Sequence, residues 1–293
     1  MPTSLLELLT LALVRCMTRA DRAPARWTAA ARIGLGVLLS VVLLAFVAPL
    51  LAPAAVTQDV VATRFLAPLT RDVHDIYHLL GTDRLGRDVF SRLLFGARIS
   101  LAVGALTMAL SLLVGVAIGA GAAFAPPRTS TLLLGLTDFA LGVPRVVLLL
   151  LLAALWPPSA VQVILVLGAT GWMPIARLVY AETRSQLGRP YVDGALALGA
   201  NRLRILFQHI VPHAAPPILA AVTLGVGNAI TLEAGLSFLG LGVQPPAASW
   251  GSLIASGRDT VVNAPWVGLA PGFALVLVVV SCTLIADGVQ ERQ

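Results

Sequence analysis

The sequence predicts an all-helical membrane protein that crosses the bilayer six times. Hydrophobic residues make up 58% of its 293 residues and charged residues only 12%, and the mean hydropathy is +0.90. These values are typical of polytopic membrane proteins and not of soluble domains. Six apolar stretches reach the length of about 20 residues that a helix needs to cross the hydrocarbon core. They are residues 33–51, 99–124, 132–155, 160–180, 217–239 and 267–286.

The ends of these stretches are marked by the flanking sequence. The stretch 33–51 follows a basic tail and is interpreted as a retained span, because it is longer than the apolar core of a secretory signal peptide. Proline pairs interrupt helices, so we expect helices to begin or end at each of them. The pairs are Pro126-Pro127, Pro157-Pro158, Pro216-Pro217 and Pro245-Pro246. Inside 99–124, Gly115 and Gly119 form a face of small residues that is expected to pack within the chain.

The basic residues indicate orientation. The chain has 20 lysines and arginines, all of them arginine, and a net charge of +6. Twelve arginines fall on the side of the N-terminus and seven on the other side, with Arg145 inside a span, which predicts that both termini are cytoplasmic. This placement accounts for the positive charge, so no nucleic-acid binding is expected. Because lysine is absent, P-loop ATP hydrolysis and Schiff-base catalysis are excluded.

A charged run, GTDRLGRDVFSRLLFGARISL, precedes the second span at residues 81–101. Its apolar residues recur at helical spacing, which predicts an amphipathic helix on the outer membrane surface; they are Leu85, Val89, Phe90, Leu93 and Leu94. Asp83 is expected to cap this helix, and Asp88 to pair with Arg92 four residues later.

Three ionisable residues lie within the predicted spans: Asp138, Arg145 and Glu233. Because charges are costly in the membrane, they should face protein or water. Asp138 and Arg145 are seven residues apart, so we expect them on one helix face, and Pro144 can open the backbone beside them. A place in a transport pathway and a purely structural polar contact both stay open, the latter for Glu233 in particular.

Histidine and cysteine give no strong site. His74 and His78 could bind a metal if their segment were helical, but a solvated pair is the preferred interpretation. Cys16 and Cys282 have no metal-ligand spacing and no reason to pair, and no function is assigned to them. No metal site is predicted, and neither H-E-x-x-H nor G-x-S-x-G occurs in the sequence, so a membrane enzyme is not expected.

Three segments, in the same order, resemble the C-type permease subunit of the ABC importer family for dipeptides, oligopeptides and nickel. The first is GTDRLGRDVFSRLLFGARISLAVG, in which the candidate residues are Gly81, Thr82, Asp83, Gly86, Arg87 and Asp88. The second is YVDGALALGANRLRILFQHIVPH, starting at Tyr191, and the third is LEAGLSFLGLGVQPPAASWGSLIASGRD, starting at Leu232. The resemblance covers about residues 81–287 and implies the type I permease fold.

The second segment resembles the coupling loop that such permeases present to their ATPases, and places this loop at residues 182–215. The matching residues are Asp193, Gly194, Ala195, Gly199, Leu203, Phe207, His209, Ile210 and Pro212. The family pattern has glutamate at the position of Asp193 and alanine at that of Gly194, and this glycine weakens the first helix by about 1 kcal/mol.

The residues of this loop also favour a helical hairpin. Gly199 suits a sharp reversal and Asn201 suits a helix cap. One helix face is then predicted to seat in a groove of the partner; its residues are Leu203, Leu206, Phe207 and Ile210.

The resemblance implies a non-catalytic subunit that forms half of a pathway for short peptides in the bacterial cytoplasmic (inner) membrane. The implied partners are a homologous B-type permease, two ATPase subunits, an extracytoplasmic substrate-binding protein and membrane lipid. No cofactor is expected in this chain, with ATP and Mg held by the ATPases. The regions are then a tail at 1–32, the first span and outer loop at 33–98, the permease core at 99–287 and a C-terminus at 288–293.

Two alternatives stay open. The same architecture could import nickel or glutathione. A solitary secondary transporter would usually show inverted repeats and coupling-ion carboxylates at mid-membrane, and Asp138 is the only obvious candidate for such a carboxylate.

Overall fold

The computed structural model describes residues 27–52, 63–73 and 75–291. Four helices in this part of the chain are each long and apolar enough to cross a membrane: α2 (Ala29–Leu51), α4 (Val89–Phe124), α11 (Val211–Phe238) and α13 (Trp266–Gln290). Two bent pairs bring the number to six if each pair is one span: α5 (Pro127–Gly142) with α6 (Arg145–Ala154), and α7 (Ala160–Ala169) with α8 (Trp172–Leu187). Each predicted span thus corresponds to one helix or one bent pair, and the all-helical prediction is confirmed.

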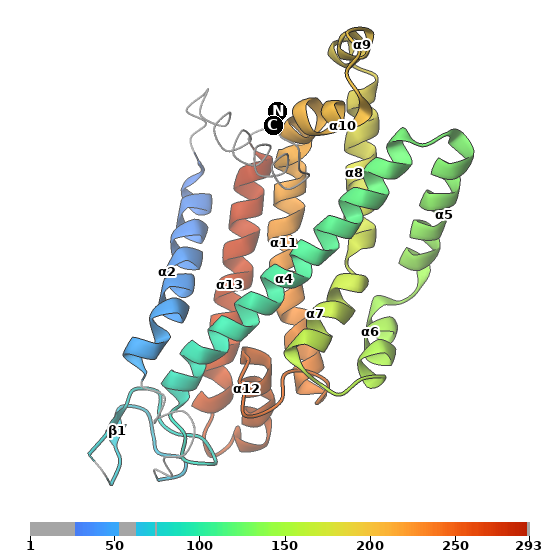
Figure 1. Cartoon of the computed structure of the whole chain (residues 1–293). Helices are drawn as coiled ribbons and strands as arrows, with labels where there is room; N and C mark the ends of the chain where they lie inside the picture. The colour runs from blue at the N-terminus through green and yellow to red at the C-terminus, as the bar shows by residue number, and fades with distance from the viewer. Residues whose placement is uncertain (1–26, 53–62, 74, 292–293) are drawn as a thin grey trace.

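Short elements gather at the two ends of the bundle (Figure 1). At one end, α9 (Pro190–Ala197), α10 (Arg202–Ile205) and a π-helical turn (Leu206–Ile210) connect α8 to α11. At the other end, β1 (Thr70–Arg71) pairs antiparallel with β2 (Tyr77–His78), and α12 (Trp250–Gly257) and a 3-10 turn (Arg258–Thr260) precede α13. We refer to the first as the α9 end and to the second, which carries the β1–β2 hairpin, as the hairpin end.

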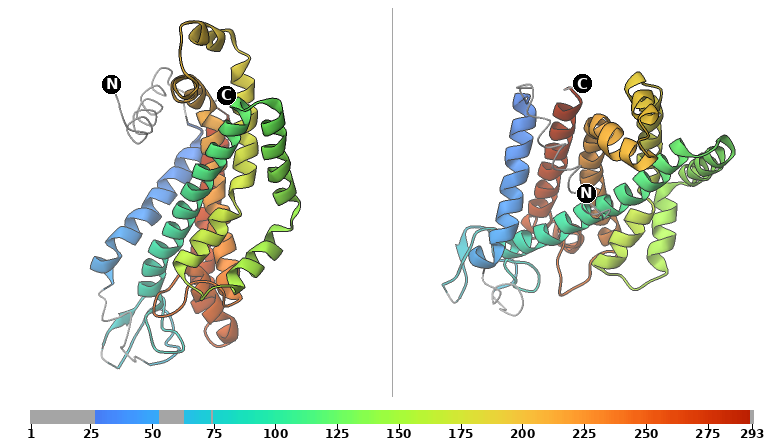
Figure 2. Two further views of the ribbon diagram at one scale, coloured as in Figure 1. Left: turned by 45° about the vertical axis from the view of Figure 1, so that its right-hand side comes forward. Right: turned by 45° about the horizontal axis from the view of Figure 1, so that its top comes forward.

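The tilted helix α4 crosses the bundle and packs against α2, α7, α8 and α11, as Figures 1 and 2 show. Glycines allow the close approach. A Cβ at Gly104 would lie 2.7 Å from Ile230 Cγ1 of α11, and one at Gly115 would lie 2.7 Å from Ile175 Cγ2 of α8. Gly119 faces the Ala176 carbonyl in the same way. The small-residue face of Gly115 and Gly119 therefore packs within the chain, as predicted.

The first half of the charged run does not form the predicted amphipathic helix, and its second half is the beginning of α4 and not a separate helix. Residues 79–88 are turns and extended backbone, and α4 begins only at Val89. The helix is capped by Asp88, whose Oδ2 accepts the Ser91 N–H at 2.6 Å, and not by Asp83. The prediction is wrong because Asp83 binds the backbone of its own turn, and such local hydrogen bonds compete with helix formation.

Three of the four proline pairs mark helix ends as expected. Pro127 begins α5, Pro157-Pro158 lies between α6 and α7, and Pro245-Pro246 lies between α11 and α12. The prediction is wrong for Pro216-Pro217, because α11 already begins at Val211 and contains both prolines. A membrane helix tolerates interior proline where its neighbours support it, and here Ala215 and Ala220 beside the pair are buried.

The third and fourth spans are each broken part-way. The third bends by 83° at Val143 and Pro144, so the expected opening of the backbone at Pro144 is present. Asp138 and Arg145 consequently lie on two different helices, and the prediction that they share one helix face is wrong. The fourth bends by 41° at Thr170 and Gly171, because Pro174 in the first turn of α8 has no N–H to bind the Thr170 carbonyl.

Candidate functional site

The α9 end forms the helical hairpin that the sequence predicts. Gly199 has φ +80°, the left-handed conformation that glycine adopts most readily, and it reverses the chain between α9 and α10. The Ala200 N–H closes the turn on the Ala195 carbonyl at 3.0 Å. Asn201 caps the next helix, since its Oδ1 accepts the Arg204 N–H at 2.7 Å.

One side of this hairpin is buried in the chain. Val192, Leu206 and Ile210 are 0%, 8% and 1% exposed and belong to one apolar cluster with Ile175 and Val179 of α8. The prediction that Leu206 and Ile210 face a partner is therefore wrong, because their side chains pack inside the chain and support the hairpin from within. The side chains of Leu203, Phe207 and His209 lie outside the described part of the structure.

The other side of the hairpin is open. Asp193, Gly194 and Gly199 are exposed, and Leu198 is 90% exposed. Figure 2 shows that α9 stands beyond the ends of the neighbouring helices. The Tyr191 ring stacks on His213 of α11 with centroids 5.5 Å apart, and the Tyr191 hydroxyl donates to Gln186 Oε1 at 2.8 Å. These contacts attach α9 to both α8 and α11.

At the hairpin end, Asp83 organises the charged run. Its Oδ1 accepts the N–H groups of Leu85 and Arg87, and its Oδ2 accepts Arg87 Nε at 2.8 Å and Arg92 Nη1 at 2.7 Å. Burial disfavours the charged carboxylate, but the hydrogen bonds and charge of Arg87 outweigh it and lower the pKa of Asp83. The charges thus hold the loop before α4 against the start of that helix, and the predicted Asp88–Arg92 pair is replaced by Asp83–Arg92.

His78 is also part of this fold. It is 3% exposed, its Nδ1 lies 2.9 Å from Asp88 Oδ1, and its Nε2 lies 3.7 Å from Asp72 Oδ2. The preferred interpretation of a solvated histidine is therefore wrong for His78, because β2 turns it inward. His74, like Cys16, lies outside the described residues, and in the described part no group of three or more His, Cys, Asp or Glu side chains is arranged to hold a metal ion.

The charged residues of the spans fall into different environments. Glu233 is 0% exposed, and its Oε1 accepts hydrogen bonds from Ser237 and Ser249, each at 2.6 Å. This geometry favours the structural interpretation of Glu233. Asp138 instead pairs with Arg177 of α8, whose Nε donates at 2.7 Å, and both side chains remain open, with 49% and 40% exposure.

Arg145 begins α6 at the break of the third span. A Cβ added at Gly171 would lie 3.2 Å from Arg145 Nη2, so the guanidinium reaches the break of the fourth span. Its Nε is buried without a hydrogen-bond partner, and no ion pair forms between Arg145 and any residue that the structure describes. The structure thus places Arg145 and Asp138 apart, with separate surroundings.

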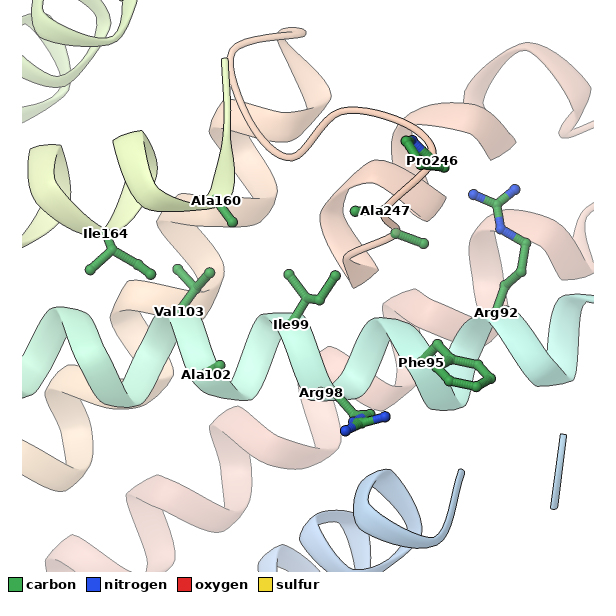
Figure 3. Close-up of a pocket in the computed structure, with 11 residues that line it drawn as sticks. Arg92, Phe95, Arg98, Ile99, Ala102, Val103, Ala160, Ile164, Pro246 and Ala247 are labelled. Atoms are coloured by element: carbon green, nitrogen blue, oxygen red, sulfur yellow. The ribbon is translucent and has the colours of Figure 1, made fainter. Parts of the chain in front are cut away.

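A cavity of about 700 Å³ lies near the hairpin end between α4, α7 and the loop before α12. In Figure 3, Ile99 and Val103 of α4 lie on the side of Ala160 and Ile164 of α7. The lining is mostly apolar, and its two charged residues are Arg92 and Arg98 of α4. Sequence patterns do not reveal this cavity, because its walls come from segments that are distant in the chain.

Arg177 is the functional candidate that sequence reasoning missed. It lies within the predicted span 160–180, so it carries the same signal as Asp138: an ionisable residue among apolar ones. Arg177 is also one of the twelve arginines counted on the side of the N-terminus, and only the fold shows that it pairs with Asp138.

Residues 111–293 match the model of the family described as binding-protein-dependent transport system inner membrane component. The chain belongs to this family. It is a transport permease subunit of an ABC importer, and the solitary secondary transporter is set aside.

The curated relatives are similar over most of this permease. A putative peptide transport system permease protein of Brucella suis is 39% identical over 260 residues, which cover 89% of this chain and 86% of that protein. The di/tripeptide transport system permease protein DppC of Pseudomonas aeruginosa is 34% identical, with 88% and 85% covered. The oligopeptide transport system permease protein OppC of Bacillus subtilis is 34% identical, with 89% and 84% covered.

Among solved structures, the permease resembles a chain of the MetNI methionine ABC transporter. The TM-score is 0.57 at 18% identity, and the match covers 69% of this permease and 96% of that chain. This likeness confirms the ABC importer permease fold.

Proposed function

We propose that this permease subunit carries short peptides across the bacterial cytoplasmic membrane. The observation that carries the proposal is its similarity, over more than four fifths of their length, to relatives whose names specify peptide, di/tripeptide and oligopeptide transport. The cavity at the hairpin end suits this cargo, because ligand sites are commonly apolar and of about 300–1,000 Å³. No feature of the described residues favours nickel, which would need a cluster of metal ligands.

In this proposal the subunit works with a homologous B-type permease, two ATPases that hold ATP and Mg, and an extracytoplasmic substrate-binding protein. The chain itself holds no cofactor. Both termini and the α9 end face the cytoplasm, where arginines accumulate. The regions are the tail 1–32, the first span and outer loop 33–98, the core 99–287 with its coupling loop 182–215, and the C-terminus 288–293.

The hairpin at the α9 end is the proposed ATPase contact. Its open side offers small residues and one acid for close approach of a partner surface: Asp193, Gly194, Ala195 and Gly199. Its other side packs on α8 through Val192, and Tyr191 stacks on His213 of α11. A force applied to α9 therefore reaches two membrane helices through packed contacts. Ile210 and Pro212 serve this connection from within the chain.

The face that carries Asp138 and Arg177 is the proposed pathway side of the subunit. These two side chains are about half exposed although they lie in membrane spans. Because lipid does not solvate charges, the face must be covered by water or by the partner permease. Arg145 begins α6, at the break of the third span that follows α5.

Co-purification tests this proposal. The tagged permease, purified in mild detergent from cells that express the whole transport system, should bring down a second permease and ATPases. ATP hydrolysis in proteoliposomes should then rise with the binding protein and a mixture of tripeptides. Recovery of the chain alone, from a preparation that remains folded, would contradict the assembly, and stimulation by nickel but not by peptides would contradict the cargo.

A further inference from the structure

Arg145 is a cation inside the membrane that the described chain does not neutralise. Arg92 binds Asp83 and Arg177 binds Asp138, both through carboxylate oxygens. Arg145 makes no such pair, and its Nε is buried without a hydrogen-bond acceptor. An arginine in this position is costly unless an acceptor is supplied.

The surroundings of Arg145 favour an anion as that acceptor. The guanidinium lies where two broken spans meet, at the first residue of α6 and beside Gly171, which precedes α8. Neither helix has a side-chain cap at its N-terminus. The Val147 N–H already binds the Pro144 carbonyl and Pro174 has no N–H, so the N–H groups that remain available are those of the first two residues of each helix. Two helix N-termini and one guanidinium together create a positive potential.

The depth of the site separates it from lipid headgroups. Figure 1 shows the connections from α5 to α6 and from α7 to α8 about midway along the bundle, far from both ends. Asp138 does not serve as the counter-ion of Arg145 in this structure, because it pairs with Arg177 and forms no ion pair with Arg145. The acceptor must then come from a molecule that enters the pathway or from the partner permease.

We propose that Arg145, with the free N–H groups that open α6 and α8, binds the C-terminal carboxylate of a peptide during its passage. This inference rests on the proposed peptide transport and adds the group of the cargo that the permease recognises. A guanidinium can bind a carboxylate through two parallel hydrogen bonds. A peptide whose carboxylate is blocked as an amide loses this interaction.

The test compares uptake of free acids and amides. A library of tripeptides without Asp or Glu is prepared as free acids and as C-terminal amides, and uptake into proteoliposomes with the complete transport system is measured by mass spectrometry. The wild type should import free acids at least about tenfold better than amides, as expected for a lost hydrogen bond between charged groups. R145Q should lower this ratio about fivefold or more, and R145K, which keeps the charge, should lower it less.

The control is R128Q, which removes an exposed arginine of α5 and should leave the ratio unchanged. The inference is overturned if R145Q has the same ratio of free-acid to amide uptake as the wild type, whatever its overall rate. An Arg145 that is only structural, or that pairs with a carboxylate of the partner permease, would slow the uptake of both libraries alike. If R145Q does not assemble, an unchanged ratio in R145K overturns it. If the wild-type transport system assembles and hydrolyses ATP but imports neither library, peptides are not the cargo and the inference fails. Failure to assemble would instead contradict the proposed assembly.

Discussion

Arg177 holds Asp138 through two of its nitrogen atoms and so joins α8 to α5 across 39 positions of sequence. Replacing either residue leaves the other charge unpaired in a membrane span. We expect D138N and R177Q each to lower the free energy of unfolding by about 2 kcal/mol, measured as thermal unfolding in detergent. Because the loss belongs to the pair, the double variant should be less destabilised than the sum of the two single variants.

A matched control for this pair lies at the hairpin end. Arg258 and Asp259 also form an ion pair, but their side chains are 59% and 63% exposed. An exposed pair contributes little, so D259N should change the unfolding free energy by less than about 0.5 kcal/mol. Equal changes of the unfolding free energy in D259N and D138N would contradict a stabilising role of the Asp138–Arg177 pair.

Asp83 is expected to stabilise the outer loop rather than the whole bundle. D83N removes the charge that Arg87 and the buried Arg92 bind, so the loop should loosen by about 1–3 kcal/mol. Limited proteolysis with trypsin reports this change, because Arg84 in the same turn is exposed and offers a cleavage site. The control V73T changes an exposed residue of the same loop and should leave the rate of cleavage at Arg84 unchanged.

The stability of the same loop is expected to decrease in acid. The folded state lowers the pKa of Asp83 from its ordinary value of 3.8. The stabilisation is therefore fully present above the unfolded-state pKa and is lost as the pH falls through the lower folded-state pKa. D83N should remove this part of the pH dependence. A pH profile of cleavage by a protease that is active in acid, identical to that of the wild type, would contradict the assignment.

The hydrophobic pattern was sufficient for the six spans, because span length and apolar content are properties of the local sequence. The same was true of the Gly199 reversal and the Asn201 cap, which depend on a few neighbouring residues. Periodicity also placed Leu206 and Ile210 on one face. Periodicity does not predict that α8, and not a partner, covers this face, because the pattern identifies an apolar face but not the element that packs against it.

The candidate site was less predictable where it depends on distant contacts. The apolar spacing from Leu85 to Leu94 is compatible with a helix, yet Asp83 turns the chain back through hydrogen bonds that spacing does not reveal. Asp138 finds Arg177 and not Arg145, since the break at Pro144 rotates the two halves of the third span. Both outcomes depend on backbone geometry, which the spacing of residues in the sequence does not determine.

Gly199 provides a test of coupling. Proline fixes φ near −65° and cannot adopt the φ of +80° at this position, so G199P should distort the reversal between α9 and α10. We expect the variant to reach the membrane but to lose peptide-stimulated ATP hydrolysis in the reconstituted transport system. G188A is the matched control, because Gly188 has φ −86° and its added Cβ would meet no atom within 4 Å. Normal stimulation in G199P would exclude the hairpin as the coupling element.

Gly171 is expected to tolerate no side chain, because the break of the fourth span is closely packed there. An added Cβ would lie 2.5 Å from Ser111 Oγ of α4 and 2.9 Å from the Leu167 carbonyl. G171A should therefore lower the free energy of unfolding by about 1–3 kcal/mol through overpacking, measured by thermal unfolding in detergent. G142A is its control, since Gly142 ends α5 at the neighbouring break and an added Cβ meets nothing within 4 Å. The two variants should differ clearly, and equal stability would show that α4 and α8 move apart at the α7–α8 break without cost.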